Sequence, residues 1–148
     1  MALSAESELP VRFTTDLAGV DWHQLKASLA ADQFDNGRSA DQLRRSFENS
    51  HSVCFAWSGA APVGTARVLS DGVCNAYLVD VWTLSSFRRR GIAREMIRQL
   101  STRLAGQHIY LQADDHIAEV YRRLGYREQP VGMSRVVGKW LVGEGEVR

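Results

Sequence analysis

The middle of the chain carries the pattern that most constrains its fold. Residues 51–59 (HSVCFAWSG) and 61–72 (APVGTARVLSDG) alternate between apolar and polar side chains, and a short turn at Gly59–Pro62 separates them. The SDG sequence at 70–72 then turns the chain into a third apolar stretch at 74–84 (CNAYLVDVWTL). Strands joined by such short turns pair with their neighbours in sequence. We therefore expect an antiparallel meander of three strands.

Helices and further strands are expected on both sides of this meander. Apolar residues at three- and four-residue spacing predict helices over 21–32, 39–50, 91–106 and 115–125. Strands are expected at 10–15 and 108–114, with one or two more within 126–143. Because residues 108–114 are almost continuously apolar, we expect that strand to be central and covered on both faces. The order β-α-α-β-β-β-α-β-α-β predicts an α+β domain with helices packed on a mixed, mainly antiparallel sheet.

Local signals mark several ends of these elements. Asp21 and Ser39 stand where an N-cap is expected for the first two helices, and Asn36-Gly37 between them is a turn sequence. Asp114 and Asp115 stand at the start of the last helix, where an N-cap is again the first interpretation.

The composition does not divide the chain into separate domains. Its 148 residues contain no internal repeat, low-complexity segment or linker, and they are enough for one hydrophobic core. Residues 1–9 are small and polar, so we expect a flexible N-terminal tail before a single domain over 10–148. The segment MALSAESELP lacks the basic region and apolar core of a signal peptide, so none is expected, and no apolar run reaches the ~18 residues of a membrane span. We expect a soluble, cytoplasmic protein with no membrane partner.

Two cysteines, Cys54 and Cys74, lie within the apolar stretches of the meander. Both are expected to be small buried side chains of a protein in a reducing compartment. A disulfide between adjacent strands remains an alternative.

Three arginines, Arg88–Arg90, directly precede Gly91 and a predicted helix. A helix N-terminus carries about half a positive charge and favours acidic residues, so cations there need a negative partner. Gly91 lets a ligand approach the backbone closely, and the free N–H groups of the first turn bind anions together with arginine side chains. Since the formal net charge is only +1, this basic patch is local. The segment predicts a pyrophosphate site, and a solvated basic turn is the alternative.

Two common classes of nucleotide site are poorly supported. The chain has no G-x-x-x-x-G-K-[ST] run of a P-loop, and it lacks the three spaced glycines of a dinucleotide-binding fingerprint.

The arginine segment resembles the acyl-CoA-binding motif of the GNAT superfamily of N-acetyltransferases, Q/R-x-x-G-x-G/A. Arg88, Gly91 and Ala93 match its fixed positions, and the apolar stretch LVDVWTL before them matches the family's preceding strand. The proline that the family commonly has ahead of this turn is replaced by Ser85-Ser86.

A second motif lies at the matching distance downstream. AEVYRRLGY at 118–126 is similar to the family pattern A-x-x-x-Y-x-x-x-G-F, with Ala118 offset by one residue. Tyr121, Leu124, Gly125 and Tyr126 fill the corresponding places. Together the two motifs and the order of elements make the resemblance specific over residues 50–126.

The resemblance implies that acetyl-CoA is the co-substrate and that an amine attacks it directly, without an enzyme nucleophile. The CoA pyrophosphate would bind the backbone N–H groups of residues 89–93 and nearby arginine side chains. The pantetheine arm and the thioester would bind the strand before the turn. The implied CoA-binding residues are Val81, Trp82, Thr83, Arg88, Arg89, Arg90, Gly91, Ile92 and Ala93.

Two residues are candidates for the proton transfers of this reaction. Tyr121 matches the family tyrosine that protonates the departing thiolate, although it also lies on an apolar stripe and could be a core residue. Gly125 is placed to end the helix, in which case Tyr126 would pack back on Tyr121. Asp80 lies within an apolar strand, where burial would raise its pKa and suit it as the general base.

The acceptor pocket is expected to draw on residues 20–40 and on the third strand of the meander. Candidates are Trp22, Phe34, Asp35 and Tyr77, with ordinary helix packing as the alternative for Trp22 and Phe34. A pocket of aromatic and acidic residues would suit a small amine with an apolar body. No metal is expected, because neither H-E-x-x-H nor paired C-x-x-C occurs and the histidines lack metal-ligand spacing.

Three functions remain open from the sequence. The first is an acetyl-CoA-dependent N-acetyltransferase acting on a primary amine of a small molecule or peptide. The second is a non-catalytic CoA-binding or sensing module of the same fold. The third, nucleic-acid binding through the arginines, is disfavoured by the low net charge. A homodimer formed through the tail strand at 133–143 is a further alternative for assembly.

Overall fold

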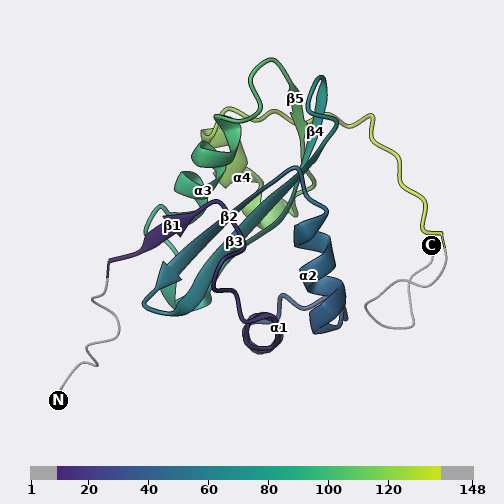
Figure 1. The fold of residues 1–148 in the computed structure, drawn as a ribbon. Helices are drawn as coiled ribbons and strands as arrows, with labels where there is room; N and C mark the ends of the chain where they lie inside the picture. The colour runs from purple at the N-terminus through teal and green to yellow at the C-terminus, as the bar shows by residue number, and fades with distance from the viewer. Residues whose placement is uncertain (1–9, 138–148) are drawn as a thin grey trace.

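The computed structural model describes residues 10–137, which build a five-stranded sheet with helices on both faces (Figure 1). The strands lie in sequence order: β1 Arg12–Thr14, β2 Ser52–Ser58, β3 Ala61–Ser70, β4 Asn75–Thr83 and β5 His108–Tyr110. Strands β1 to β4 pair antiparallel, and β5 pairs parallel to β4. The predicted α+β fold with a mixed, mainly antiparallel sheet is confirmed. The expected flexible tail at 1–9 lies outside the described residues.

The expected three-strand meander is present as β2, β3 and β4. Ser58 pairs with Ala61, so Gly59 and Ala60 form a two-residue turn, and Gly59 has a positive φ of 59°. Between β3 and β4, one carboxylate oxygen of Asp71 accepts hydrogen bonds from the backbone of residues 73–75. Both turns are therefore stabilised locally, which is why the sequence pattern predicted them.

The helices are α1 Trp22–Ala31, α2 Ala40–Glu48, α3 Ile92–Ser101 and α4 Asp115–Arg123. The predicted caps of α1 and α2 are confirmed: Asp21 accepts from the Gln24 N–H, and Ser39 forms a capping box with Gln42. Asp114 stands at the N-cap position of α4, but its side chain makes no capping bond. Helix α3 ends five residues before Gly106, earlier than its pattern suggested.

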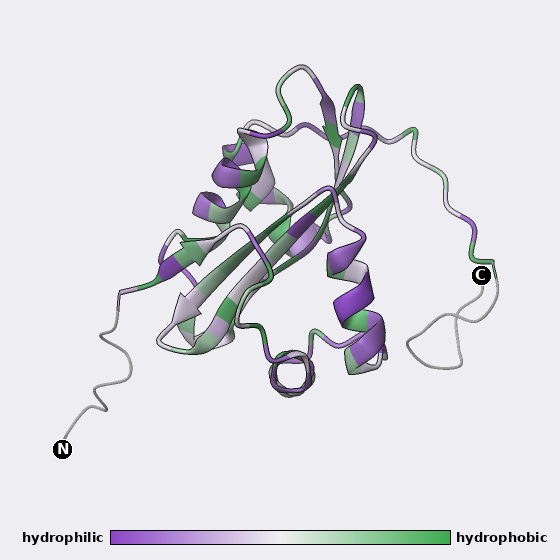
Figure 2. Cartoon of the chain, in the orientation of Figure 1, coloured by the Kyte–Doolittle hydropathy of each residue, from purple (hydrophilic) through white to green (hydrophobic). Residues whose placement is uncertain are grey.

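Strand β2 separates two hydrophobic clusters because its side chains alternate between the two faces of the sheet. Phe55 and Trp57 pack with the apolar residues of α1 and α2, whereas Cys54 and Ala56 pack with those of α3. Figure 2 shows hydrophobic residues along the strands and hydrophilic ones over much of α2. Helices α1, α2 and α3 thus each bury apolar side chains in these clusters, whereas α4 has no fully buried residue and contributes the partly buried Tyr121.

Helix α3 lies unusually close to the sheet at Gly64. A Cβ added to Gly64 would lie 3.1 Å from Met96 Cε and 3.2 Å from Ile92 Cγ2. Because Ile92 is the first residue of α3, this close contact positions the helix N-terminus against the sheet.

The part of the sheet around β5 differs from the prediction. Strand β5 has three residues rather than seven, and its residues pair only with Asn75, Ala76 and Tyr77 of β4. Among residues 10–137 it is the last strand of the sheet, and the exposure of His108 and Tyr110 contradicts the expectation that both of its faces are covered. From Leu78 to Thr83, the edge of β4 that faces away from β3 pairs with no strand among residues 10–137.

The expected tail strands are absent from the described part of the tail. Residues 126–137 form no helix or strand, and residues 138–143 lie outside the described range. Cys74 is exposed in the loop before β4, so its expected burial is wrong, whereas Cys54 is buried. Both thiols are free. No helix within residues 10–137 has the length and apolar character to cross a membrane.

Candidate functional site

The segment that we call the arginine turn, Arg88–Gly91, leads from a short 3₁₀ helix (η2, Ser85–Phe87) into α3. Gly91 has φ 75° and Arg89 has φ 64°, both in the left-handed region. Gly91 occupies the N-cap position and has no side chain to cap the helix, and the first helical bond runs from the Glu95 N–H to the Gly91 carbonyl at 3.0 Å. The N–H groups of the first turn therefore keep their capacity to bind an anion.

Two of the three arginines are tied to neighbouring groups. Arg88 Nε donates to the Thr83 carbonyl at 3.2 Å, and its guanidinium lies 3.7 Å from an Asp32 carboxylate oxygen. The Arg90 guanidinium lies 4.9 Å from the centre of the Phe87 ring. Arg88 nevertheless remains 57% exposed. The turn therefore presents an ordered positive surface rather than a set of buried ion pairs.

Asp32, which the sequence analysis did not identify, holds this turn against the end of β4. Its carboxylate accepts from Trp82 Nε1 at 2.8 Å and from the backbone N–H and hydroxyl of Ser85. Partial burial raises the pKa of Asp32, but these hydrogen bonds and Arg88 outweigh it and leave the pKa below its usual value. A proline at position 85 could not donate this backbone hydrogen bond. No local pattern marks Asp32, since its partners lie about fifty residues away.

Strand β4 contains a bulge beside the arginine turn. Thr65 pairs with Trp82 and Arg67 with Val79, so two residues of β4 stand opposite one residue of β3. The bulge shifts the alternation of side chains: Leu78 packs with the α3 cluster, whereas Trp82, four residues later, packs with the α1 and α2 cluster. Asp80, within the bulge, has φ 51°.

Asp80 is held by two arginines that the sequence analysis also missed. Arg38, in the loop before α2, donates to both carboxylate oxygens at 3.0 Å, and Arg67 Nε donates to one of them at 2.5 Å. The Thr65 hydroxyl donates to the Asp80 carbonyl at 2.9 Å. Burial alone would raise the pKa of Asp80, but hydrogen bonds and charge from the arginines lower it. The expected raised pKa is therefore wrong.

The last residues of β4 face different surroundings. The Trp82 ring is buried in the α1 and α2 cluster, and Val81 packs against the α3 cluster. Thr83 Oγ1 is buried and has no hydrogen-bond partner among residues 10–137. A buried hydroxyl without a partner is costly, so this atom fits a site completed by a polar ligand.

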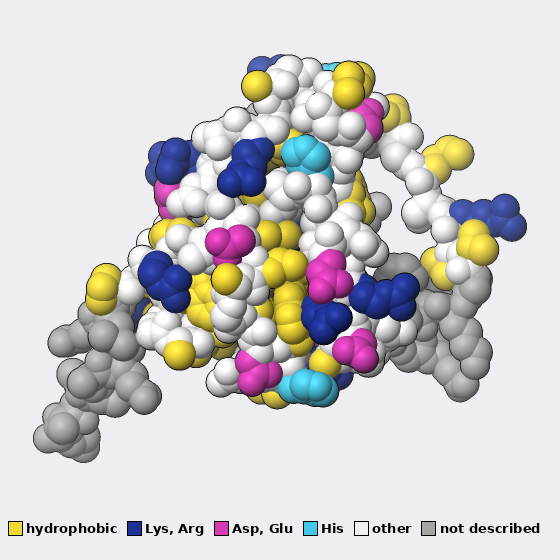
Figure 3. All heavy atoms as spheres, in the orientation of Figure 1, with side chains coloured by type: hydrophobic (Ala, Val, Ile, Leu, Met, Phe, Trp, Pro, Cys, Tyr) yellow, Lys and Arg dark blue, Asp and Glu magenta, His cyan; other side chains and the backbone are white. Residues whose placement is uncertain are grey.

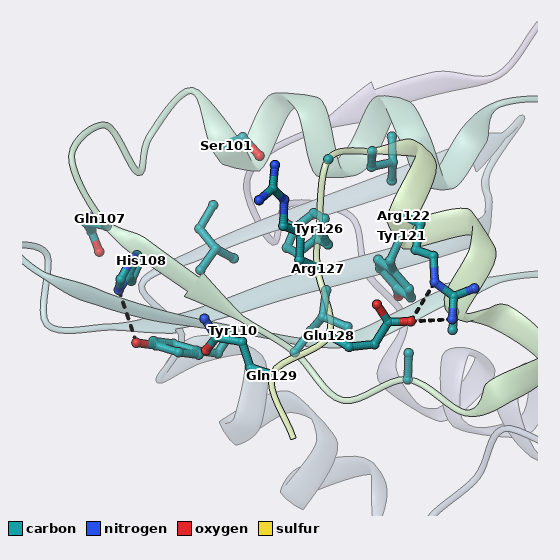
Figure 4. A pocket seen from close by; sticks show the side chains of 16 residues that line it. Ser101, Gln107, His108, Tyr110, Tyr121, Arg122, Tyr126, Arg127, Glu128 and Gln129 are labelled. Atoms are coloured by element: carbon teal, nitrogen blue, oxygen red, sulfur yellow. Dashed lines mark hydrogen bonds and ion pairs between the residues drawn. The ribbon is translucent and has the colours of Figure 1, made fainter. Parts of the chain in front are cut away.

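Tyr121 lies in the last turn of α4, and this helix ends at Gly125 as the sequence predicted. The Tyr126 N–H bonds the Tyr121 carbonyl and the Gly125 N–H bonds the Arg122 carbonyl, a Schellman motif with Gly125 at φ 93°. The Tyr121 and Tyr126 rings meet edge to face at 5.8 Å. Both pack against the α3 cluster and line a cavity of about 530 Å³ between β5, α4 and the tail (Figure 4). Burial raises the pKa of Tyr121.

The residues expected in the acceptor pocket lie on α1, in the loop after α1 and on β4. Trp22 packs against Phe47 and Phe55, with ring centroids 5.5 and 6.3 Å apart, as the packing alternative predicted. Phe34 is 39% exposed in the loop after α1, and Asp35 in the same loop forms an ion pair with Lys26 at 3.3 Å. Tyr77 lies on β4 and pairs with Tyr110 of β5. Residues 10–137 contain no group of three or more His, Cys, Asp or Glu arranged to hold a metal.

Comparison with known proteins identifies a family for this arrangement. The model of the acetyltransferase (GNAT) domain family matches residues 20–141. Over 74 residues the chain is 32% identical to "Histone acetyltransferase TAP1" of Glycine max, covering 48% of this chain and 32% of that protein. The chain therefore spans about a third of the length of the curated relatives it matches.

Solved structures share the fold at low sequence identity. A proposed acetyltransferase from Deinococcus radiodurans R1 has a TM-score of 0.75 and 22% identity, covering 91% of this chain and 93% of that one. A GNAT-family acetyltransferase from Streptococcus pneumoniae TIGR4 has a TM-score of 0.73 and 18% identity, covering 88% and 100%. Glucosamine-6-phosphate N-acetyltransferase from Arabidopsis thaliana has a TM-score of 0.66 and 15% identity, covering 87% and 99%.

Proposed function

The chain belongs to the GNAT acetyltransferase family, and on this premise we propose that it moves an acetyl group from acetyl-CoA to a primary amine of a small molecule or peptide. The observation that carries this proposal is the uncapped start of α3, which follows the arginine turn and the bulged end of β4. This arrangement offers free N–H donors, positive charge and an open strand edge to one ligand.

The arginine turn would hold the pyrophosphate of acetyl-CoA. Free N–H groups between Arg89 and Ala93 would donate to phosphate oxygens, and the guanidiniums of Arg88, Arg89 and Arg90 would add charge-assisted bonds. A side chain on Gly91 would point into space that contains no protein atom within 4 Å, which is where such a ligand would lie.

The end of β4 would hold the pantetheine arm and orient the acetyl group. Past Tyr77, β4 lacks a neighbouring strand within the described chain, so backbone groups of Val81, Trp82 and Thr83 can bond an extended ligand. The buried Thr83 hydroxyl would gain a partner there. The thioester supplies an activated acetyl group, and a fixed N–H donor beside its carbonyl would favour attack by the amine.

Tyr121 would protonate the departing thiolate, and the resulting phenolate would recover the proton that the amine nitrogen loses on acylation. Because burial raises its pKa, the phenol is protonated at neutral pH and can act as an acid. Its place beside Gly125 and Tyr126 holds the ring in one orientation.

Asp80 is better suited to positioning than to accepting the amine proton. Both of its carboxylate oxygens are bonded to arginines, and its lowered pKa makes it a weak base. A non-glycine residue at φ 51° is strained, and the bonds from Arg38, Arg67 and Thr65 hold it there. We assign Asp80 the role of maintaining the β4 bulge, which sets the direction of the residues after it.

One experiment tests the proposed function. The protein is incubated with acetyl-CoA and a panel of primary amines while free thiol is measured, and CoA is titrated in parallel by calorimetry. We expect binding of CoA and thiol release that depends on the amine. Binding without turnover on any amine would instead support the CoA-sensing module, and absence of CoA binding would overturn both.

A further inference from the structure

The arginine cluster around Asp80 contains more positive than negative charge. The side chains of Arg38 and Arg67 are only 10% and 12% exposed, and both bond the single carboxylate of Asp80, which is 17% exposed. Within residues 10–137 no other carboxylate lies within 4.0 Å of either guanidinium. Three charged groups with a net charge of +1 are thus largely removed from water. Such an excess is unfavourable unless an anion compensates it.

The remaining donors of this cluster are directed to neutral groups. Arg38 Nε donates to the Asn36 side chain at 2.8 Å, while Arg67 Nη1 donates to the Ser46 carbonyl at 3.3 Å and the Ser50 hydroxyl at 3.4 Å. These bonds fix the guanidiniums without neutralising them. A planar guanidinium has five N–H donors, and three from Arg38 are used, so it retains donors for another acceptor.

A shallow, open hollow of about 260 Å³ lies beside Arg38 along the face of α2 that carries the exposed residues Gln42, Arg45 and Asn49. It is lined by Arg38, Gln42, Arg45, Ser46 and Asn49. This set contains a second arginine and three neutral hydrogen-bonding side chains, and no carboxylate. Figure 3 shows basic and acidic side chains mixed on the side of the molecule where α2 lies, next to a hydrophobic patch at the centre of this face, so the lining residues rather than the whole surface give the hollow its positive charge. The hollow therefore has the charge and donors that suit an anion.

The hollow is connected to the proposed transfer site through one side chain. Arg38 lines the hollow and also bonds Asp80, which directly precedes Val81–Thr83 on β4. The hollow lies on the side of the sheet that α1 and α2 cover, whereas α3 covers the other side. A ligand bound at Arg38 would therefore approach the end of β4 from the face opposite α3.

We propose that this hollow binds an anionic group, a carboxylate or a phosphate, carried by the acceptor amine. The inference rests on the proposed acetyltransferase function and deepens it by naming the acceptor class. It also revises the expectation of a pocket containing acidic residues, because Asp35 is paired with Lys26 and arginines line the hollow instead.

The test uses Arg45, which lines the hollow but is not bonded to Asp80. Arg45→Gln is compared with Arg44→Gln, since Arg44 is adjacent, half-exposed and paired with Glu48 at 3.0 Å. Ethanolamine, phosphoethanolamine and β-alanine present the same two-carbon amine with a neutral group, a phosphate or a carboxylate. We expect the wild type to prefer one or both charged amines by at least tenfold in kcat/KM. Arg45→Gln should lose about tenfold on them through KM, and Arg44→Gln should match the wild type.

A binding measurement makes the proposal testable even if none of these amines is turned over. The wild type and both variants are saturated with CoA, so that the arginine turn is occupied, and their thermal stability is followed against inorganic phosphate and acetate. A stabilisation by either anion that Arg45→Gln loses and Arg44→Gln keeps would support the site and identify the preferred anion. Equal responses in all three proteins, or equal use of charged and neutral amines, would overturn it. Failure of CoA binding, measured separately, would overturn the proposed function instead.

Discussion

The indole N–H of Trp82 donates a 2.8 Å hydrogen bond to the carboxylate of Asp32, across fifty positions of the sequence. The same carboxylate accepts from Ser85, which begins the path to the arginine turn. Asp32 therefore joins the end of α1, the end of β4 and the turn. This side chain thus links the α1 side of the sheet to the proposed CoA site, in addition to the link that Arg38 makes to Asp80.

We expect Asp32→Asn to lower the free energy of unfolding by about 1–3 kcal/mol at pH 7, because it removes charged acceptors from Ser85 and Trp82. The pKa of Asp32 is lowered in the folded protein, so its stabilisation is present above the unfolded value near 3.9 and is lost as pH falls through the folded value. Urea unfolding of the wild type and of Asp32→Asn, at pH 7 and below pH 4, measures the difference between their free energies of unfolding. We expect this difference to shrink at low pH, and an increase would contradict the stabilising role of the Asp32 carboxylate.

Gly91→Ala should weaken CoA binding more than its effect on stability explains. Gly91 and Gly106 have φ of 75° and 78°, and an added Cβ meets no atom within 4 Å at either position. Each alanine should therefore cost a similar ~1 kcal/mol of stability. Only Gly91 precedes the free N–H groups of α3. Calorimetry should show a loss of CoA affinity of about tenfold for Gly91→Ala and none for Gly106→Ala, and equal affinities would refute the role of the turn.

Tyr121→Phe should keep CoA affinity and lower kcat severalfold or more. The substitution removes the hydroxyl and leaves the ring packed against Tyr126. Because the pKa of Tyr121 is raised, the wild-type rate should decline only at high pH, as the phenol ionises, and the variant should lack that decline. Steady-state kinetics across pH provide the measurement, and an unchanged kcat throughout would exclude Tyr121 as the acid.

Arg38→Gln distinguishes positioning by Asp80 from base catalysis. Removing Arg38 takes away two hydrogen bonds that lower the pKa of Asp80. If Asp80 were the base, the acid limb of the kcat/KM profile would move to higher pH in this variant. We expect a lower kcat with the limb unmoved, because the β4 bulge loses a support. Asp80→Asn should also cost about 3 kcal/mol of stability, since it leaves two arginines facing a neutral group.

The two thiols should differ strongly in reactivity. Cys54 is buried, and burial together with the nearby Glu95 raises its pKa to about 11, whereas Cys74 is exposed. At pH 8 iodoacetamide should modify Cys74 and leave Cys54 unmodified in the native protein. Peptide mass spectrometry before and after denaturation identifies the site, and Cys74→Ser should abolish the native reaction.

Local chemistry along the chain was enough to predict much of the framework. Several features depend on residues only a few positions apart, so the sequence predicts them. They are the meander, the caps at Asp21 and Ser39, and the Schellman motif at Gly125. The same holds for the start of α3 at Gly91, where the absence of a capping side chain follows from the residue type.

Contacts between distant segments decided the chemistry of the charged groups. Asp80 was expected to have a raised pKa because its strand neighbours are apolar, but Arg38 lies 42 positions away and Arg67 lies 13 away, and together they reverse the shift. The composition of β5 likewise predicted that both faces of the strand are covered, yet His108 and Tyr110 are exposed, because burial depends on which segments pack against the strand. The pKa of a side chain and the burial of a strand both depend on the groups that surround them in space. Those groups come from distant parts of the sequence and become neighbours only in the folded chain.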